Sequence, residues 1–158
     1  MPGGIETGGI EQLSEMLGNL GENTERIASA ALYAGAAVMA DAYRAAAGSI
    51  VTGSARHHSE PGGRLPTPAE KAAVQNVGIA HFRHEGGAEV DTVIGMPEGY
   101  ADVNGHKKAI KLIARSINSG TSFMQKQPVF RRASRTAKAS SEQAMVARAE
   151  ALIDTITK

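Results

Sequence analysis

Histidine is the residue type in this chain that most invites a metal-binding hypothesis, and its five copies include two close pairs. His57 and His58 lie near Glu60 in a segment rich in Gly and Pro, and His81 and His84 lie in a segment with strand-like alternation. Positions three apart on a strand point to opposite faces, so the second pair would not share a metal. The chain has no HExxH motif. We therefore expect solvated or interface histidines, and no metal or other cofactor.

Nucleophilic and phosphate-binding chemistry has little support in the residue pattern. Cysteine is absent, which excludes thiolate catalysis and Cys-ligated zinc or iron–sulfur sites. No serine lies in a Gly-x-Ser-x-Gly elbow, and Gly62-Gly63 lacks the Lys-Ser/Thr that completes a phosphate-binding loop. The carboxylates Glu89 and Asp91 share the solvent face of a predicted strand. We expect a protein that is not an enzyme.

Basic side chains are concentrated in the second half of the chain. Residues 103–141 carry nine Lys and Arg and no Asp or Glu. These are Lys107, Lys108, Lys111, Arg115, Lys126, Arg131, Arg132, Arg135 and Lys138. On a helix, Lys107, Lys111 and Arg115 would form one positive stripe, which suits phosphates without reading sequence. Only Phe123 and Phe130 are aromatic there, which argues against recognition of single strands by stacking.

Acidic side chains dominate the opposite end of the chain. Residues 1–25 carry five Glu and no Lys or Arg. Four of them, Glu11, Glu15, Glu22 and Glu25, form a candidate acidic face for contact between subunits. A second positive cluster, Arg131, Arg132 and Arg135, lies near the start of the last predicted helix. This layout indicates self-assembly through opposed faces or a basic surface turned toward DNA, and solvated helix faces are the equally weighted alternative.

Length and composition predict one ordinary domain over residues 1–158. A chain of this size buries roughly 70% of its unfolded surface, so it folds without disulfides or metals. No apolar run approaches the roughly 20 residues that span a bilayer, so we expect no membrane partner. Aromatic residues are 4% of the chain and Trp is absent, which leaves Ala, Leu, Ile, Val and Met to build the core.

The chain from Ile10 to about Ala47 has the periodicity of an amphipathic helix. Apolar or small residues recur at steps of three, four and seven, at Ile10, Leu13, Leu17, Leu20, Ile27, Ala31, Ala34, Val38 and Ala42. Gly18 and Gly21 each cost roughly 1 kcal/mol relative to Ala. We therefore expect a short helix, a bend or break at these glycines, and a long helix over about 22–47. Because Gly35 has no side chain, we expect that another backbone could approach the long helix closely at this position. The expected buried side carries Leu32, Val38, Met39 and Tyr43.

The middle of the chain predicts a loop, a short helix and a hairpin. Gly and Pro punctuate a flexible loop at about 48–67. Thr67 and Glu70 then fit a capping box, with Pro68 at the first helical position. A β-hairpin follows, with arms at 77–84 and 88–96 and a turn at 85–87.

The last third of the chain predicts mainly helix. Ile110, Ile113 and Ile117 favour a helix over residues 107–117, and a strand is the alternative. The final helical region starts at Pro128, and a second start at Ser140 fits a capping box with Gln143. The expected fold class is α+β, with a long N-terminal helix and a C-terminal helix packed on a small antiparallel β-sheet.

The junction before the final helix carries a recognisable motif. Gly120 allows a sharp turn, Thr121 and Ser122 satisfy turn amides, Pro128 starts a helix, and Phe130 attaches that helix to the core. Together with the Gly-then-Leu-rich opening, the Ala-rich helix and Thr52-Gly53, this junction resembles the signature of the phage tail-component family. That family lies between head-connector and tail-tube proteins of long-tailed, siphovirus-type bacteriophages. Ser119 stands where an acid is common, and Val129 separates Pro128 from Phe130. Residues 57–105 do not contribute to the resemblance.

The resemblance implies a structural protein of the virion, assembled in the host cytoplasm and placed in the neck of the tail. It would form a homomeric ring, a hexamer, at the head-proximal end of the tail, for tail completion and head–tail joining. Its partners would be further copies of itself, the tail-tube protein, the head–tail connector proteins, and genomic DNA that passes through the lumen without sequence recognition. A tail terminator or a head–tail stopper or adaptor of the same neck is one alternative. A small basic nucleic-acid-binding regulator is an alternative from another class.

Overall fold

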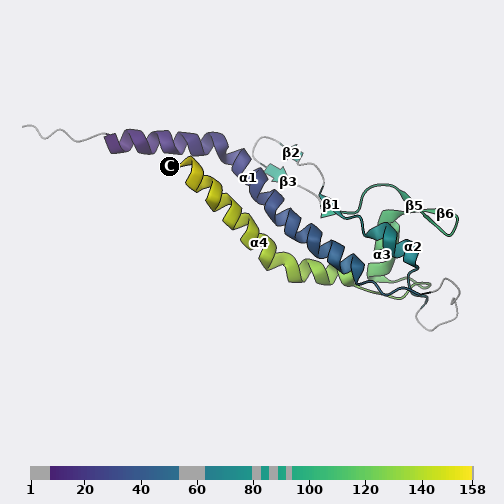
Figure 1. Ribbon diagram of the computed structural model, residues 1–158. Coiled ribbons are helices and arrows are strands. Elements are labelled where there is room, and N and C mark those ends of the chain that lie inside the picture. Colours follow the sequence, from purple (N-terminus) through teal and green to yellow (C-terminus); the bar gives the residue numbers. More distant parts are fainter. Residues whose placement is uncertain (1–7, 54–62, 80–82, 86–88, 92–93, 158) are drawn as a thin grey trace, which may run out of the picture.

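The computed structural model describes residues 8–53, 63–79, 83–85, 89–91 and 94–157. It consists of two long helices that lie side by side, with the shorter elements gathered mainly around one end of the pair (Figure 1). The elements are α1 (Gly8–Gly48), α2 (Pro68–Val74), β1 (Gly78–Ile79), β2 (Arg83–Glu85), β3 (Glu89–Asp91), β4 (Ile94–Gly95), β5 (Tyr100–Val103), β6 (His106–Ala109), α3 (Ile110–Ser119) and α4 (Val129–Ile156). The predicted α+β class, with long N-terminal and C-terminal helices and small antiparallel sheets, is confirmed.

The helices α1 and α4 pack against each other along a seam of small residues. Gly35 lies against Met145 and Ser141, and the Ser141 hydroxyl donates to the Gly35 carbonyl at 2.9 Å. What approaches Gly35 closely is therefore a pair of side chains, whereas we expected another backbone. The predicted buried side of α1 is only half-buried, and the buried positions of this helix are Gly35 and alanines such as Ala36 and Ala40. Small side chains are buried here because the two helix backbones lie close together.

The sequence predicts a bend or a break near Gly18 and Gly21, and of these two the break is wrong, whereas the helix does bend in its N-terminal half (Figure 1). α1 runs for 41 residues through Gly18 and Gly21. Two glycines cost about 2 kcal/mol of helix propensity, but extending an anchored helix avoids the cost of a new nucleus. The second start at Ser140 is also wrong, because α4 is continuous from Val129 to Ile156 and Ser140 lies inside it. Pro128 is the N-cap and Val129 is the first helical residue, so the helix begins one residue later than we predicted.

One of the two β-hairpins was predicted from the sequence, and the other was not. The first is confirmed: Ile79 pairs with Ile94 and His84 with Val90, both antiparallel. The predicted turn at 85–87 begins one residue too early, because Glu85 pairs with Glu89 as the last residue of β2, and residues 86 and 87 lie outside the described residues. The second hairpin, β5–β6, was not predicted, although Asn104-Gly105 is a strong hairpin signal and both residues have positive φ angles, 57° and 79°.

The segment 107–117 combines the two structures that we weighed for it. Residues up to Ala109 form strand β6, and helix α3 begins at Ile110. The helix prediction is therefore wrong for residues 107–109. Lys107 lies on a strand while Lys111 and Arg115 lie on a helix, so the three do not form one helical stripe. The strand extends to Ala109 because all four β6 residues pair with β5.

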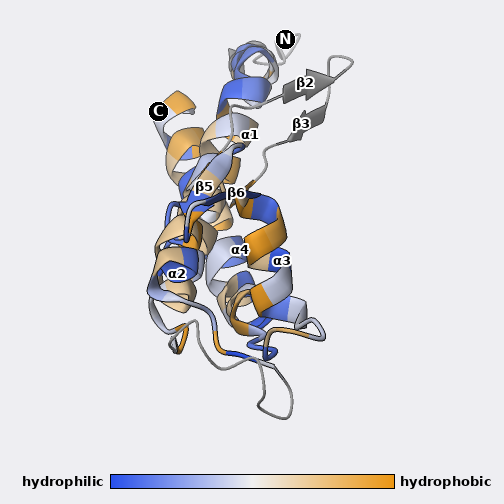
Figure 2. Cartoon of the chain, turned by 90° about the vertical axis from the view of Figure 1, so that its right-hand side faces the viewer, coloured by the Kyte–Doolittle hydropathy of each residue, from blue (hydrophilic) through white to orange (hydrophobic). Residues whose placement is uncertain are grey.

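The core lies where α2, α3 and β5 meet the C-terminal end of α1 and the first turn of α4 (Figure 2). Its buried members are Ala47, Ile50, Val74, Val103, Ile113, Ala114, Ile117, Met124 and Phe130. The Phe130 ring packs edge-on against Tyr43 at 5.9 Å between centroids, which confirms that Phe130 attaches α4 to the core.

The predicted loop at 48–67 is held at both of its described ends. Ile50 is buried, and the Gly53 amide donates to the Pro66 carbonyl at 3.0 Å. The Gln127 side chain bonds both the amide and the carbonyl of Val51, at 2.9 and 2.8 Å. The rest of the predicted loop, residues 54–62, lies outside the described residues.

Candidate assembly surfaces

The turn after α3 forms at Gly120 and Thr121 as the sequence predicts. Gly120 has a φ of 75° and caps α3 by donating to the Ser116 carbonyl at 2.9 Å. The Thr121 hydroxyl accepts from the amides of Phe123 and Met124 at 3.2 and 3.1 Å. Thr121 therefore satisfies the turn amides, as expected, whereas the Ser122 side chain is exposed. The turn leaves the Phe123 side chain 69% exposed.

A short backbone bridge fixes this turn to the segment before α2. The Arg64 amide donates to the Phe123 carbonyl, and the Gln125 amide donates to the Arg64 carbonyl, each at 2.9 Å. A Cβ atom on Gly63 would lie 2.6 Å from the Phe123 carbonyl carbon and 2.7 Å from the Met124 nitrogen. Glycine is therefore required at position 63, because both its φ of 86° and this close approach disfavour any side chain.

The Arg64 side chain continues the link into α2 through a buried ion pair. Its two terminal nitrogens donate to the two carboxylate oxygens of Glu70 at 2.7 and 2.6 Å. Glu70 is 1% exposed and completes the predicted capping box with Thr67, which is confirmed. Burial alone would raise the pKa of Glu70. The Arg64 and Thr67 hydrogen bonds, together with the charges of Arg64 and Lys108, outweigh burial and lower this pKa to about 2.

Above this ion pair lies an open groove of about 660 Å³, which we call the basic groove. Its lining residues include Arg64, Glu70, Tyr100, Lys107, Lys108, Leu112, Thr121, Ser122 and Phe123. Three of them are large apolar side chains exposed to solvent: Tyr100 by 73%, Leu112 by 61% and Phe123 by 69%. Such a cluster of exposed apolar side chains beside lysines is typical of a site for another macromolecule.

The predicted basic residues separate into two surfaces. Lys107 and Lys108 line the basic groove, and Lys111 and Arg115 are exposed on α3 beside it. Two of these lysines are paired with acids, Lys108 with Glu70 at 3.4 Å and Lys111 with Glu98 at 2.8 Å. Lys126 is exposed on the segment that follows the turn.

The second basic surface is the first two turns of α4, which we call the arginine cluster. It comprises Arg131, Arg132 and Arg135, and all three side chains are exposed. Among the residues that the structure describes, none of the three forms an ion pair. The cluster is therefore the more open of the two surfaces to an anionic partner such as DNA.

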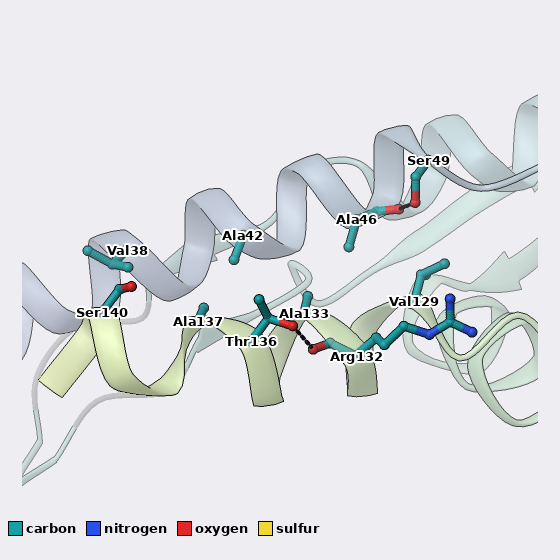
Figure 3. A pocket seen from close by; sticks show the side chains of 10 residues that line it. All are labelled: Val38, Ala42, Ala46, Ser49, Val129, Arg132, Ala133, Thr136, Ala137 and Ser140. Carbon is teal, nitrogen blue, oxygen red and sulfur yellow. Dashed lines mark hydrogen bonds between the residues drawn. The ribbon is translucent and has the colours of Figure 1, made fainter.

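A shallower depression, the seam groove, runs between α1 and α4 (Figure 3). Its volume is about 450 Å³. In Figure 3, Val38, Ala42 and Ala46 point from α1 toward the lining residues of α4, and Arg132 lies at the end near Val129. Small side chains line most of this groove, and none of its lining residues is an exposed large hydrophobic.

At the other end of the molecule, α1 extends past the end of α4 (Figure 1). Ile156 lies eleven residues after Met145, which packs against Gly35, so α4 ends opposite about residue 24 of α1. We call α1 residues 8–22 the acidic overhang. Leu13, Met16 and Leu17 on it are 54%, 37% and 59% exposed.

The predicted acidic residues lie on or next to this overhang. Glu15 and Glu22 are exposed on it, and Glu25 is exposed just beyond it. Glu11 lies on the same helix, and its side chain is outside the described residues. At 100° per residue, Glu15 and Glu22 fall on the opposite side of α1 from Leu13, Met16 and Leu17. The overhang thus has one apolar face and one acidic face.

The described residues bring no metal-binding cluster together: no three His, Asp or Glu side chains among them are arranged to hold an ion. His57, His58, Glu60 and His81 lie outside those residues, and His84 lies on β2. No described helix combines the length and apolar character that a membrane-spanning segment requires.

Comparison of the chain with protein-family models, with curated proteins and with solved structures finds no match in any of the three. The features that bear on function are therefore the charge and exposed apolar side chains at the two ends of the molecule.

Proposed function

We propose that this chain is a structural virion protein of a tailed bacteriophage, which forms a homomeric ring at the head-proximal end of the tail. The observation that carries the proposal is the difference between the two ends of the molecule. The acidic overhang and the basic groove both expose large apolar side chains, and they carry opposite charges. A molecule with two unlike, complementary surfaces associates head to tail, and a closed ring results when the rotation between neighbours closes.

The likeness of the sequence to the phage tail-component family supports the setting of this ring. The motif that carries the likeness, from Gly120 to Phe130, forms one wall of the basic groove and the attachment of α4 to the core. In this proposal the ring finishes the tail and joins it to the head, with the tail-tube protein on one side and head–tail connector proteins on the other.

The arginine cluster is our candidate for the surface that faces the DNA channel. Its side chains are exposed, and arginine binds phosphate oxygens without reading base sequence. The lysines beside the basic groove are weaker candidates, because Glu70 and Glu98 offset part of their charge.

Mass photometry of the full chain, combined with negative-stain microscopy of the chain mixed with tail tubes, tests the proposal. We expect closed rings at one end of the tubes, and we expect the chain among the proteins of purified virions. A chain that is monomeric alone and with tail tubes, and that is absent from virions, would contradict the ring.

Binding experiments on the same purified protein distinguish the positions in the neck and test the alternative of a nucleic-acid-binding regulator. Rings that bind connector proteins but not tail tubes would indicate a head–tail stopper or adaptor, and rings that bind only tubes would indicate a tail terminator. Salt-dependent duplex binding by a monomer, lost in the double variant Arg131→Ala with Arg132→Ala, would instead indicate a nucleic-acid-binding regulator.

A further inference from the structure

We infer that the acidic overhang of one copy docks through its apolar face in the basic groove of the next copy. The inference rests on the proposed ring and names the contact that builds it. Leu13, Met16 and Leu17 are the docking side chains, and Tyr100, Leu112 and Phe123 receive them.

The overhang has an apolar face that nothing in its own chain's described residues covers. Farther along α1, the residues near Gly35 are covered by α4, but α4 ends opposite about residue 24. Leu13 and Leu17 lie one turn apart on the helix, and each is more than half exposed. An amphipathic helix with such a face binds by laying it into an apolar groove, with contacts at steps of three and four residues.

The basic groove has the chemistry and the rigidity to receive such a helix. Tyr100 comes from β5, Leu112 from α3, and Phe123 from the turn after α3, so they surround the groove from three elements. The Phe123 backbone is hydrogen-bonded to Arg64, whose side chain is locked to Glu70. Because the apolar side chains sit on a preformed base, little ordering entropy is lost on binding.

The charges of the two surfaces are complementary, but the helix geometry limits what they do. Glu15 and Glu22 point away from the apolar face, so they stay in solvent when the leucines are buried. They attract Lys107 and Arg115 through the field of the surface and not through buried ion pairs. Apolar contacts should therefore set the dissociation rate, and charge should set the association rate.

Two other occupancies are less favourable. The seam groove is lined mainly by small side chains and exposes no large apolar residue to receive a leucine. Duplex DNA would leave Tyr100, Leu112 and Phe123 without apolar partners, and two of the nearby lysines are already paired with acids.

Two variants with one damaged end each test the contact. The overhang variant carries Leu13→Glu and Leu17→Glu, and the groove variant carries Leu112→Glu and Phe123→Glu. All four positions are exposed, so both variants should keep the circular dichroism and melting temperature of the wild type. Thr136→Glu, an exposed position in the seam groove, is the matched control.

We expect each double variant to weaken self-association by at least about 100-fold, since two buried leucine-sized contacts are lost. Mass photometry should show monomers where the wild type and Thr136→Glu form rings. Mixing the two double variants should give a one-to-one heterodimer and nothing larger, because the pair retains one intact overhang and one intact groove that can meet.

Several outcomes would overturn this contact. Rings from either folded double variant would do so, as would a mixture that stays monomeric. Loss of rings in Thr136→Glu alone would assign the overhang to the seam groove. Loss of duplex binding in the groove variant with rings retained would assign the groove to DNA. A wild-type chain that stays monomeric at its highest soluble concentration would overturn the contact as well.

The contact and the proposed function fail in distinguishable ways. Rings that form through this contact in vitro, from a chain that is absent from virions, would remove the phage neck and leave the contact standing. Rings that are present in virions but survive Leu13→Glu with Leu17→Glu would remove the contact and leave the neck standing.

Discussion

The base of the basic groove is sensitive to substitution at Gly63. Alanine there would place a methyl group within 2.8 Å of three backbone atoms of Phe123 and Met124, at a φ of 86°. We expect Gly63→Ala to lower the free energy of unfolding by about 2–4 kcal/mol, measured by urea denaturation. Gly48→Ala, where the added carbon meets open space, is the control and should change stability by less than about 1 kcal/mol. Equal stability of Gly63→Ala and wild type would show that the two backbones are farther apart.

Glu70 should make stability depend on pH in the acid range. Its pKa is about 2 in the folded chain, against a reference value of 4.5. The unfolded chain therefore takes up this proton first as the pH falls. The stabilisation is complete above about pH 4.5, declines between 4.5 and 2, and is absent below 2. The difference between these pKa values corresponds to about 3 kcal/mol.

The measurement compares wild type with Glu70→Gln by urea denaturation from pH 7 to pH 2. Other carboxylates titrate in both proteins, so the informative quantity is the difference in unfolding free energy between them. That difference should be largest near neutral pH and should shrink as the pH falls from 4.5 to 2. A difference that stays constant over this window would show that Glu70 is not ionised against Arg64 in the folded chain.

At the scale of elements, the seam between α1 and α4 depends on Gly35. A Cβ atom there would lie 2.3 Å from the terminal carbon of Met145 and 3.0 Å from the Ser141 hydroxyl oxygen. A leucine there collides with the Met145 and Ser141 side chains, which would have to be displaced from the seam, so Gly35→Leu should cost about 2–3 kcal/mol by thermal or urea unfolding. Met145→Ala in the same chain should recover part of this loss, because it removes the side chain in conflict. A Gly35→Leu chain as stable as wild type would contradict the close packing.

Elements with a local signal were the ones that the sequence predicted well. The Thr67–Glu70 capping box and the first hairpin depend on residues that are neighbours in the chain. Ser140 carries an equally good start signal, but it falls inside a continuous helix that packs along α1. Asn104-Gly105 shows the reverse case, because it is a strong hairpin signal at a hairpin that is not among the predicted elements.

The candidate site was only partly predictable, for a related reason. The Gly120–Thr121 turn and most of the basic residues were identified from local sequence. The link from Phe123 to Arg64 joins residues 59 positions apart in the chain, and no local pattern announces it. The exposed side chains of Tyr100 and Leu112 likewise become one surface only when β5 and α3 fold together.

At the scale of the whole molecule, the arginine cluster should account for much of the affinity of rings for DNA. Replacing Arg131, Arg132 and Arg135 by Gln should leave ring formation intact and weaken duplex binding. The slope of log affinity against log salt should fall by about 0.9 for each phosphate contact removed. Fluorescence anisotropy over a KCl series measures this. Lys138→Gln, at an exposed α4 lysine within 3.8 Å of Glu142, is the control, and an unchanged slope in the triple variant would place the DNA elsewhere.

The packing of Gly35 against Ser141 and Met145 sets the register between α1 and α4. It fixes where α4 stops along α1, and therefore how far the bare end of α1 reaches beyond it. Shortening α4 by seven residues would bare about 10 Å more of α1. The docking side chains Leu13 and Leu17 would keep their places on α1, so such a chain would keep the spacing of its neighbours and would only expose more bare helix between them.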